Sequence, residues 1–199
     1  MPEGHLVLIV ENDPAKVEAD LAEGRVACPA CGGVLARWSF ARRRHVRAEQ
    51  GPTLLRPRRA RCRRCAKTQV LLPDVLLCRR VDSVAVIGRA LVAAGEGAGR
   101  RRAAEVARRP VSTVRDWLRR FRSLASQVAA HFTVWAHRLD ANLGPIAPSG
   151  SALADALAAI GVAGRAASLR FGPRPAWSWA SALSGGMLLA NTSSPSKEA

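Results

Sequence analysis

The chain has 199 residues, of which 48% are hydrophobic, and a net charge of +16, so it is long enough to bury one medium core or two small ones. So strong a positive charge favours an anionic partner, above all a polynucleotide. No run of eighteen apolar residues occurs, which predicts that no helix crosses a membrane.

The charge is distributed unevenly. Residues 1–27 carry two basic and six acidic side chains, residues 37–67 carry twelve basic and one acidic, and residues 79–122 carry twelve basic and four acidic. The positive charge is therefore concentrated in two separate segments, which are the candidate contacts for an anionic polymer.

Residues 1–27 predict an acidic arm made of a strand and a helix. The apolar run Leu6–Val10 predicts a short buried strand. Asp13 and Pro14 are a typical N-cap and first-turn residue of a helix over 14–23, which Gly24 ends. Acidic residues rather than a cleavage site follow the apolar run, so a signal peptide is not expected and we assign the protein to the cytoplasm, in association with the nucleoid.

Two cysteine pairs, thirty residues apart, predict a metal site. In a reducing cytoplasm, C-x-x-C pairs are more often metal ligands or redox dithiols than structural disulfides. Two such pairs flanking a strand pair are typical of a structural zinc ribbon, here over residues 28–78, with no open position for catalysis. The predicted zinc ligands are Cys28, Cys31, Cys62 and Cys65. The fifth cysteine, Cys78, follows an apolar pair and predicts a buried thiol rather than another ligand.

The segment between the cysteine pairs predicts a basic hairpin. Val34–Phe40 and Thr53–Ala60 have the pattern of strands in a small antiparallel sheet, with Thr68–Leu72 leading out past the second pair. Guanidinium groups suit phosphate, so we expect backbone contacts from Arg42, Arg43, Arg44, Arg56, Arg58 and Arg59.

Residues 79–145 predict three helices. The first ends at the loop 95–99, the second spans Arg100–Ala107, and the third begins near Val111 after an Arg-Arg-Pro turn. Apolar residues from Val114 to Leu139, alternately four and three apart, predict a long third helix. Their stripe could be a homodimer seam, but packing against the chain's own helices is favoured, because Phe132 and Trp135 are bulky for a two-stranded seam.

The second and third helices have the pattern of a helix-turn-helix. Ala104 is small where the helices would cross, and Val114, Trp117 and Leu118 could clamp the second of them. Residues expected to read bases are Ser112, Thr113, Arg115, Asp116 and Arg119, and those expected to contact phosphate are Arg108, Arg109, Arg120 and Arg122. An ordinary helical hairpin with a solvated basic face is the alternative.

The remaining segments carry weaker signals. Residues 146–190 predict a helical and irregular packing segment with a helix at Ser151–Ile160, and Trp177 and Trp179, two apart, suggest a strand face. Residues 191–199 predict a disordered tail. The fold class is therefore α+β: a zinc ribbon followed by an all-α helix-turn-helix domain with a long third helix.

The run Ser-Thr-Val-Arg-Asp-Trp-Leu-Arg-Arg-Phe, after its Arg-Pro turn, resembles the helix-turn-helix of bacterial insertion-sequence transposases, in which a zinc ribbon also precedes that module. Over residues 1–145 the chain resembles small uncharacterised bacterial proteins of this layout. That likeness rests on 28–33, 55–59, 62–65 and 71–73. Arg108 departs from the pattern, because such turns usually hold glycine. The resemblance implies a zinc-dependent protein that binds double-stranded DNA.

We do not expect an enzyme, nor a small-molecule substrate. The 77 residues after the basic segment at 79–122 hold three acids, Asp140, Asp155 and Glu198, which are too few for two-metal phosphoryl transfer. The chain has no tyrosine, which excludes the chemistry of a tyrosine recombinase. The alternatives to a DNA-binding protein are an RNA-binding ribbon protein, a non-enzymatic adaptor whose arginines bind an acidic partner protein, and a remnant of a transposase.

Overall fold

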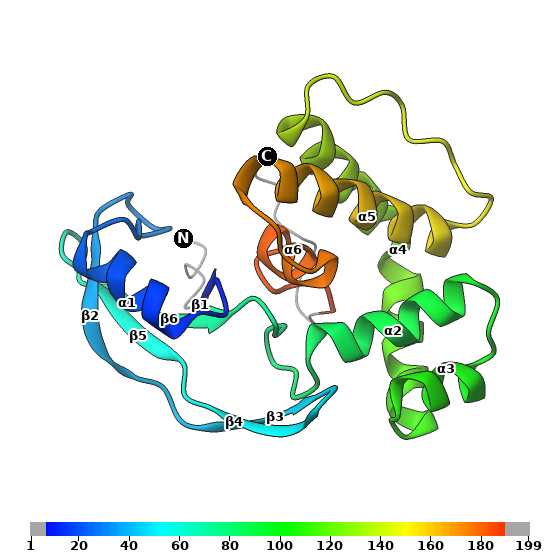
Figure 1. Cartoon of the computed structure of the whole chain (residues 1–199), viewed down its shortest axis with the longest axis horizontal. Coiled ribbons are helices and arrows are strands. Elements are labelled where there is room, and N and C mark those ends of the chain that lie inside the picture. The colour runs from blue at the N-terminus through cyan, green and yellow to red at the C-terminus, as the bar shows by residue number, and fades with distance from the viewer. Residues whose placement is uncertain (1–6, 190–199) are drawn as a thin grey trace.

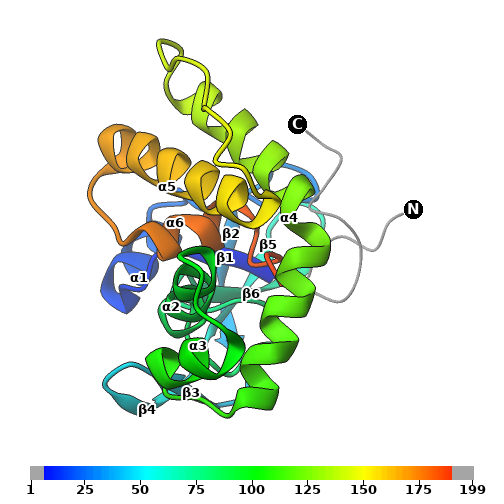
Figure 2. The same ribbon diagram turned by 90° about the vertical axis from the view of Figure 1, so that its right-hand side faces the viewer.

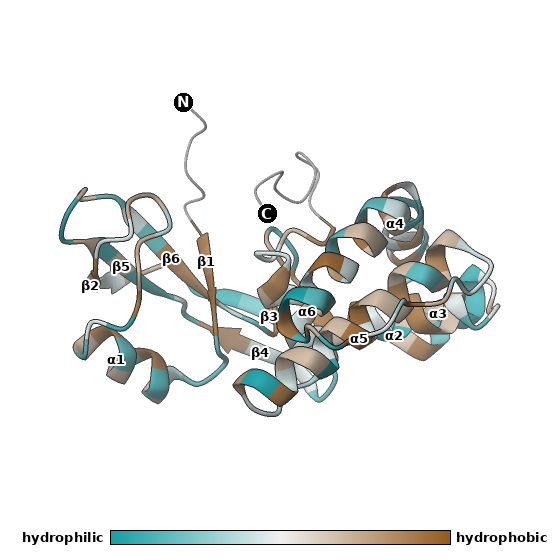
Figure 3. Ribbon diagram, turned by 90° about the horizontal axis from the view of Figure 1, so that it is seen from above, coloured by the Kyte–Doolittle hydropathy of each residue, from teal (hydrophilic) through white to brown (hydrophobic). Residues whose placement is uncertain are grey.

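The computed structural model describes residues 7–189, so the tail predicted at 191–199 lies outside the described residues. The chain forms an α+β structure in two lobes, a sheet lobe and a helical lobe, with a two-stranded hairpin at one end between them (Figure 1). Apolar residues occur in both lobes (Figure 3). The buried apolar side chains form one large cluster in the helical lobe and two smaller ones in the rest of the molecule, of which one includes Val46 of the hairpin.

The sheet lobe contains a four-stranded sheet in the order β1-β6-β5-β2, formed by β1 (Val7–Val10), β2 (Leu35–Phe40), β5 (Arg58–Cys62) and β6 (Thr68–Pro73). The prediction of an antiparallel sheet was incomplete, because β1 pairs with β6 in parallel. The backbone of β1 thereby obtains hydrogen-bond partners on β6, and β1 covers the edge of β6 that would otherwise be open.

Helix α1 (Pro14–Ala22) covers one face of this sheet. The Asp13 carboxylate caps it by accepting hydrogen bonds from the N–H groups of Ala15 and Lys16, at 2.9 and 3.2 Å. Its buried residues Val17 and Leu21 share a core cluster with residues of β2, β5 and β6. The acidic N-terminal segment is thus an integral layer of the sheet lobe.

The hairpin of β3 (Arg44–Ala48) and β4 (Gly51–Leu55) is a separate two-stranded sheet. The single strand predicted over Thr53–Ala60 is therefore two strands, β4 and β5, with Arg56 and Pro57 between them. Proline has no N–H to donate to a neighbouring strand, so the ladder stops there and β5 continues in the other sheet.

The helical lobe begins with α2 (Val84–Gly95), α3 (Arg100–Ala107) and α4 (Val111–Leu139), where the sequence predicted helices. The apolar stripe of α4 is buried within the chain, including Val114, Phe121 and Phe132 at 1% exposure or less. Helix α5 (Ala152–Phe171) runs beside α4 in Figures 1 and 2. The stripe packs on the chain's own helices, which is the arrangement that the sequence favoured, and a homodimer stays a prediction.

The C-terminal elements differ from the prediction. Helix α5 continues to Phe171 rather than ending at Ile160, because alanine and other helix-forming residues carry it on. The two tryptophans lie in α6 (Ala176–Leu183) and not in a strand. Residues two apart on a helix point in different directions, so the two tryptophans contact different neighbours. Trp177 packs over Gly88 of α2, and the Trp179 indole N–H donates to the Ser168 hydroxyl at 2.8 Å.

By length and composition alone, α5 is apolar enough to cross a membrane, which corrects the expectation that no segment of the chain could. Charged residues interrupt the apolar run in the sequence, yet the mean hydropathy of the helix is that of an apolar segment. It packs along α4 and α6 through small residues such as Ala156, Ala159 and Ala163, as the core helix of a bundle does.

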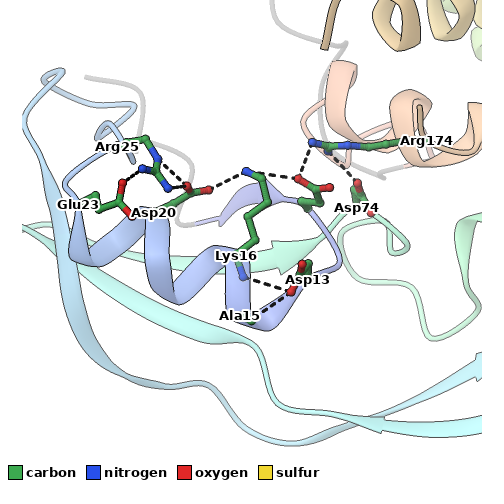
Figure 4. Close-up of polar contacts among 9 residues, drawn as sticks. Asp13, Ala15, Lys16, Asp20, Glu23, Arg25, Asp74 and Arg174 are labelled. Carbon is green, nitrogen blue, oxygen red and sulfur yellow. Dashed lines mark hydrogen bonds and ion pairs between the residues drawn. The ribbon is translucent and has the colours of Figure 1, made fainter. Parts of the chain in front are cut away.

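Charged side chains join the two lobes (Figure 4). The Arg174 guanidinium, just before α6, contacts Glu11 at 2.9 Å and Asp74 at 3.1 Å. Glu11 also contacts Lys16 of α1 at 3.5 Å. Burial raises the pKa of the Asp74 carboxyl, while the Arg174 charge opposes that effect. The network holds the end of β1 and α1 against the C-terminal segment.

Candidate functional site

The four predicted ligand cysteines lie together. Their sulfur atoms are all within 4.8 Å of one another, with 3.8 Å between Cys28 and Cys65 and 3.5 Å between Cys31 and Cys62. Sulfurs about 2.3 Å from a tetrahedral zinc ion lie about 3.8 Å apart. The cluster therefore has the donors and the size of a four-thiolate metal site, and zinc fits both.

Both cysteine pairs are held in the same backbone turn. In the first, the Gly32 N–H donates to the Cys28 carbonyl at 2.8 Å, and in the second the Ala66 N–H donates to the Cys62 carbonyl at 3.1 Å. Gly32 and Ala66 occupy equivalent positions and both have a left-handed backbone, with φ of 70° and 59°. The second turn thus imposes on an alanine a conformation that favours glycine.

The electrostatics of the cluster favour a bound cation. The N–H groups of Cys65 and Arg64 donate to the Cys62 sulfur and help to lower its pKa to about 6. The N–H of Gly33 lowers the pKa of Cys31, but the neighbouring sulfurs and desolvation outweigh it and raise that pKa to about 11. One thiolate forms readily, whereas several thiolates so close together require a positive ion between them.

Gly33 is required by its surroundings. A Cβ there would lie 2.8 Å from the Arg64 Cβ and 3.1 Å from the Cys62 sulfur. The two knuckles can approach closely because this position has no side chain. Cys78 lies outside the cluster, with its sulfur 3.7 Å from the carbonyl oxygen of Gly185, and it is partly buried rather than buried as predicted. This partial burial raises the pKa of its thiol.

The ten arginines predicted to contact phosphate differ in exposure. Five are exposed and five are partly buried. Arg58 is one of the second group, because it contacts Glu18 at 2.8 Å and donates to the Ser39 carbonyl at 3.2 Å. The exposed residues are Arg42, Arg43, Arg56, Arg108 and Arg122, and the partly buried ones are Arg44, Arg58, Arg59, Arg109 and Arg120.

Arg109 has a structural role that the sequence did not reveal. Its guanidinium contacts the Asp82 carboxylate at 2.5 Å and donates to the Arg47 carbonyl at 2.8 Å, and Arg47 of β3 reaches the same carboxylate at 2.8 Å. The Asp82 side chain is only 4% exposed. These residues fix the β3–β4 hairpin to the turn between α3 and α4. Their separation along the chain left no local pattern to indicate it.

The residues predicted to read bases share the first turns of α4. The side chains of Arg115 and Arg119 are 62% and 70% exposed, and both lie near the Asp116 carboxylate, at 3.9 and 3.5 Å. Ser112 is exposed and Thr113 is partly so. In the preceding turn Arg108 has φ of 52° and ψ of 48°, so it adopts the left-handed conformation that a glycine would take there.

The sequence prediction overlooked an aromatic residue in the basic segment. Trp38 of β2 is 55% exposed, and the Arg61 guanidinium lies 4.8 Å from the centre of its ring. Tryptophan and phenylalanine alternating among arginines was the signal that could have identified it.

Comparison with known families gives one match. Residues 28–117 match the model of a family described as a domain of unknown function, DUF6431. The matched range begins at the first cysteine of the cluster and ends at Trp117 in α4. No curated protein and no solved structure matches the chain, so these comparisons show no similarity to a transposase.

Proposed function

We propose that this protein binds double-stranded DNA and depends on zinc for its fold. In this proposal α3, the turn and α4 act as a helix-turn-helix of the kind found in transposases and transcription factors. The first turns of α4 enter the major groove, and the β3–β4 hairpin contacts the DNA backbone. The protein acts by binding rather than by catalysis, in the cytoplasm and in association with the nucleoid.

The observation that carries the proposal is the position of the two basic elements. The β3–β4 hairpin and the start of α4 lie at the same end of the molecule in Figures 1 and 2. The buried Asp82 carboxylate, bound by Arg47 from the hairpin and Arg109 from the turn, holds them there. A rigid pair of basic surfaces suits a duplex, in which groove and phosphates have a fixed spacing.

The exposed face of α4 supports a role in reading sequence. A helix with its side chains is about 10–12 Å wide and a major groove is about 12 Å wide. Arg115 and Arg119 are four residues apart and so project from one face of α4. The Asp116 carboxylate lies 3.9 and 3.5 Å from the two guanidiniums. Arginine is the usual partner of guanine in the major groove.

Zinc has a structural role in this proposal. Four cysteine ligands leave no position for a substrate or a water molecule. The cluster joins the start of β2 to the end of β5, and the hairpin lies between these two strands in the chain. The metal therefore fixes the base of the segment that carries the hairpin.

The proposal is tested by selecting bound sequences from a random duplex library with the zinc-loaded protein and then measuring affinity for the selected site. Arg119→Ala should weaken binding to that site about 5- to 150-fold, with a much smaller effect on random duplex. Arg165→Ala changes an exposed arginine of α5, outside both basic elements, and is the matched control.

Equal loss of affinity for selected and random DNA would refute base reading by Arg119. Failure to enrich any sequence, with tighter binding of structured RNA than of duplex DNA at the same salt, would favour the alternative of an RNA-binding ribbon protein.

A further inference from the structure

The exposed tryptophan of β2 lies in a β-bulge. The pairing of β2 with β5 shifts between Arg37 and Ser39, which leaves Trp38 as the extra residue at the edge of the sheet. Bulges at sheet edges redirect side chains and prevent edge-to-edge pairing. The bulge thus presents the indole of Trp38 to solvent.

Trp38 lies on the sheet face opposite α1. Alternate residues of a strand point to opposite faces, and Ala60 and Cys62 of β5 are buried with α1. Arg59 and Arg61 therefore point to the other face, where the Arg61 guanidinium lies over the Trp38 ring. This face combines the exposed ring of Trp38 with Arg61, which is exposed, and Arg59, which is partly buried.

The surroundings of this face are strongly basic. Between Leu35 and Thr68 the sequence holds twelve basic side chains and a single acid, Glu49. Of the twelve, Arg37 and Arg58 contact Glu18 of α1 on the other face, and Arg47 of the hairpin contacts Asp82. Arg63 and Lys67, in the second cysteine turn beside β5, are exposed. The charge suits a phosphate backbone and the ring suits the face of a base.

We propose that the Trp38 face binds single-stranded DNA, with an unpaired base stacked on the indole and its phosphates on the neighbouring arginines. Base stacking requires bases that are not already stacked in a duplex, so this site is distinct from the proposed duplex surface. Figure 1 shows the two apart, with β2 and β5 in the sheet lobe and α3 and α4 in the helical lobe. A protein with both surfaces could hold a junction between paired and unpaired strands.

Phe40, the other exposed aromatic residue of β2, is a weaker candidate. Two guanidiniums, of Arg56 and Arg58, already lie within 4.7 Å of the centre of its ring. Arg58 is in turn paired with Glu18 of α1, so an acidic side chain adjoins that face. Trp38 has one guanidinium over its ring and is the more accessible.

The test measures binding of the zinc-loaded full chain to oligothymidylate of about 12 nucleotides, within the range of single-strand site sizes. Trp38→Ala should weaken this binding about 5- to 150-fold, and Trp38→Phe should restore most of it, because phenylalanine can still stack. The matched control is Phe171→Ala, which removes an aromatic ring that is 56% exposed and also has an arginine over it, in the helical lobe.

Unchanged oligothymidylate binding in correctly folded Trp38→Ala, judged by its bound metal and circular dichroism, would overturn the proposal. So would equal losses for Trp38→Ala and Phe171→Ala, or tighter binding of oligouridylate than of oligothymidylate, which would assign the face to RNA. Duplex affinity should stay unchanged in Trp38→Ala, so this site and the proposed duplex surface can fail independently.

Discussion

The backbone conformation of a single residue, Ala66, shapes the second turn of the cysteine cluster. It follows the second cysteine pair with φ of 59°, in the position that Gly32 occupies after the first pair with φ of 70°. A left-handed backbone costs an L-residue about 1–2 kcal/mol, and glycine avoids that cost. The fold accepts the strain because the turn brings Cys65 to the cluster.

Ala66→Gly is therefore expected to stabilise the metal-bound protein by about 1 kcal/mol, because strain relief exceeds the extra entropy of glycine in the unfolded chain. Denaturant unfolding at fixed metal concentration measures the change. Gly32→Ala is the reciprocal control and should destabilise by a similar amount. Destabilisation by Ala66→Gly would mean that the alanine methyl group contributes more than its conformation costs.

Among the elements, α2 and α6 depend on a glycine for their close packing. A Cβ added to Gly88 would lie 2.1 Å from an atom of the Trp177 indole. The indole ring thus occupies the space that a side chain at position 88 would fill, which allows α6 to approach α2 closely.

Gly88→Ala should destabilise the protein by about 1–3 kcal/mol, because the added methyl group forces Trp177 out of its place. The matched control is Gly161→Ala in α5, where a Cβ would meet nothing within 4 Å. That change should stabilise by about 0.5–1 kcal/mol through helix propensity. Thermal unfolding of both variants checks the prediction, which is wrong if they shift the midpoint in the same direction.

The hairpin and the α3–α4 turn are held together by one buried carboxylate. Asp82→Asn should destabilise the protein by about 1–3 kcal/mol, because Arg47 and Arg109 lose their shared counter-charge. Asp116→Asn removes an exposed partner of two arginines and should cost less than about 1 kcal/mol. Hydrogen exchange of the β3–β4 amides should rise in Asp82→Asn alone. Equal protection in both variants would show that the carboxylate does not fix the hairpin.

At the scale of the whole molecule, the two lobes rest on different interactions. The sheet lobe has a small apolar cluster beside the four cysteines, whereas the helical lobe has a continuous core drawn from residues between Leu77 and Leu189. A small core rarely holds a domain together without a metal or cross-link, so we expect the stability of the sheet lobe to depend on a metal ion held by the four cysteines.

Removing the metal with a chelator should therefore unfold the sheet lobe while most of the helical signal remains. Amides of β5 and β6 should lose protection from hydrogen exchange, and those of α4 and α5 should keep it. Cys62→Ser should produce the same pattern without a chelator. Cooperative loss of protection in both lobes would show instead that contacts such as Arg174 with Asp74 couple them into one unit.

The sequence by itself determined the features that depend on local pattern. The cysteine spacing predicted which four cysteines lie together. Apolar periodicity with Asp13, Pro14 and the Arg-Arg-Pro turn predicted α1 to α4, because caps, turns and helix faces are encoded within a few residues. Only the tertiary structure decided the parallel pairing of β1, the helical state of Trp177 and Trp179, and the structural role of Arg109. Each depends on a partner distant in the chain: β6 for the first strand, Gly88 for Trp177, and Asp82 for Arg109. Such pairings arise when distant elements pack and bury their groups together, so no short stretch of sequence contains them.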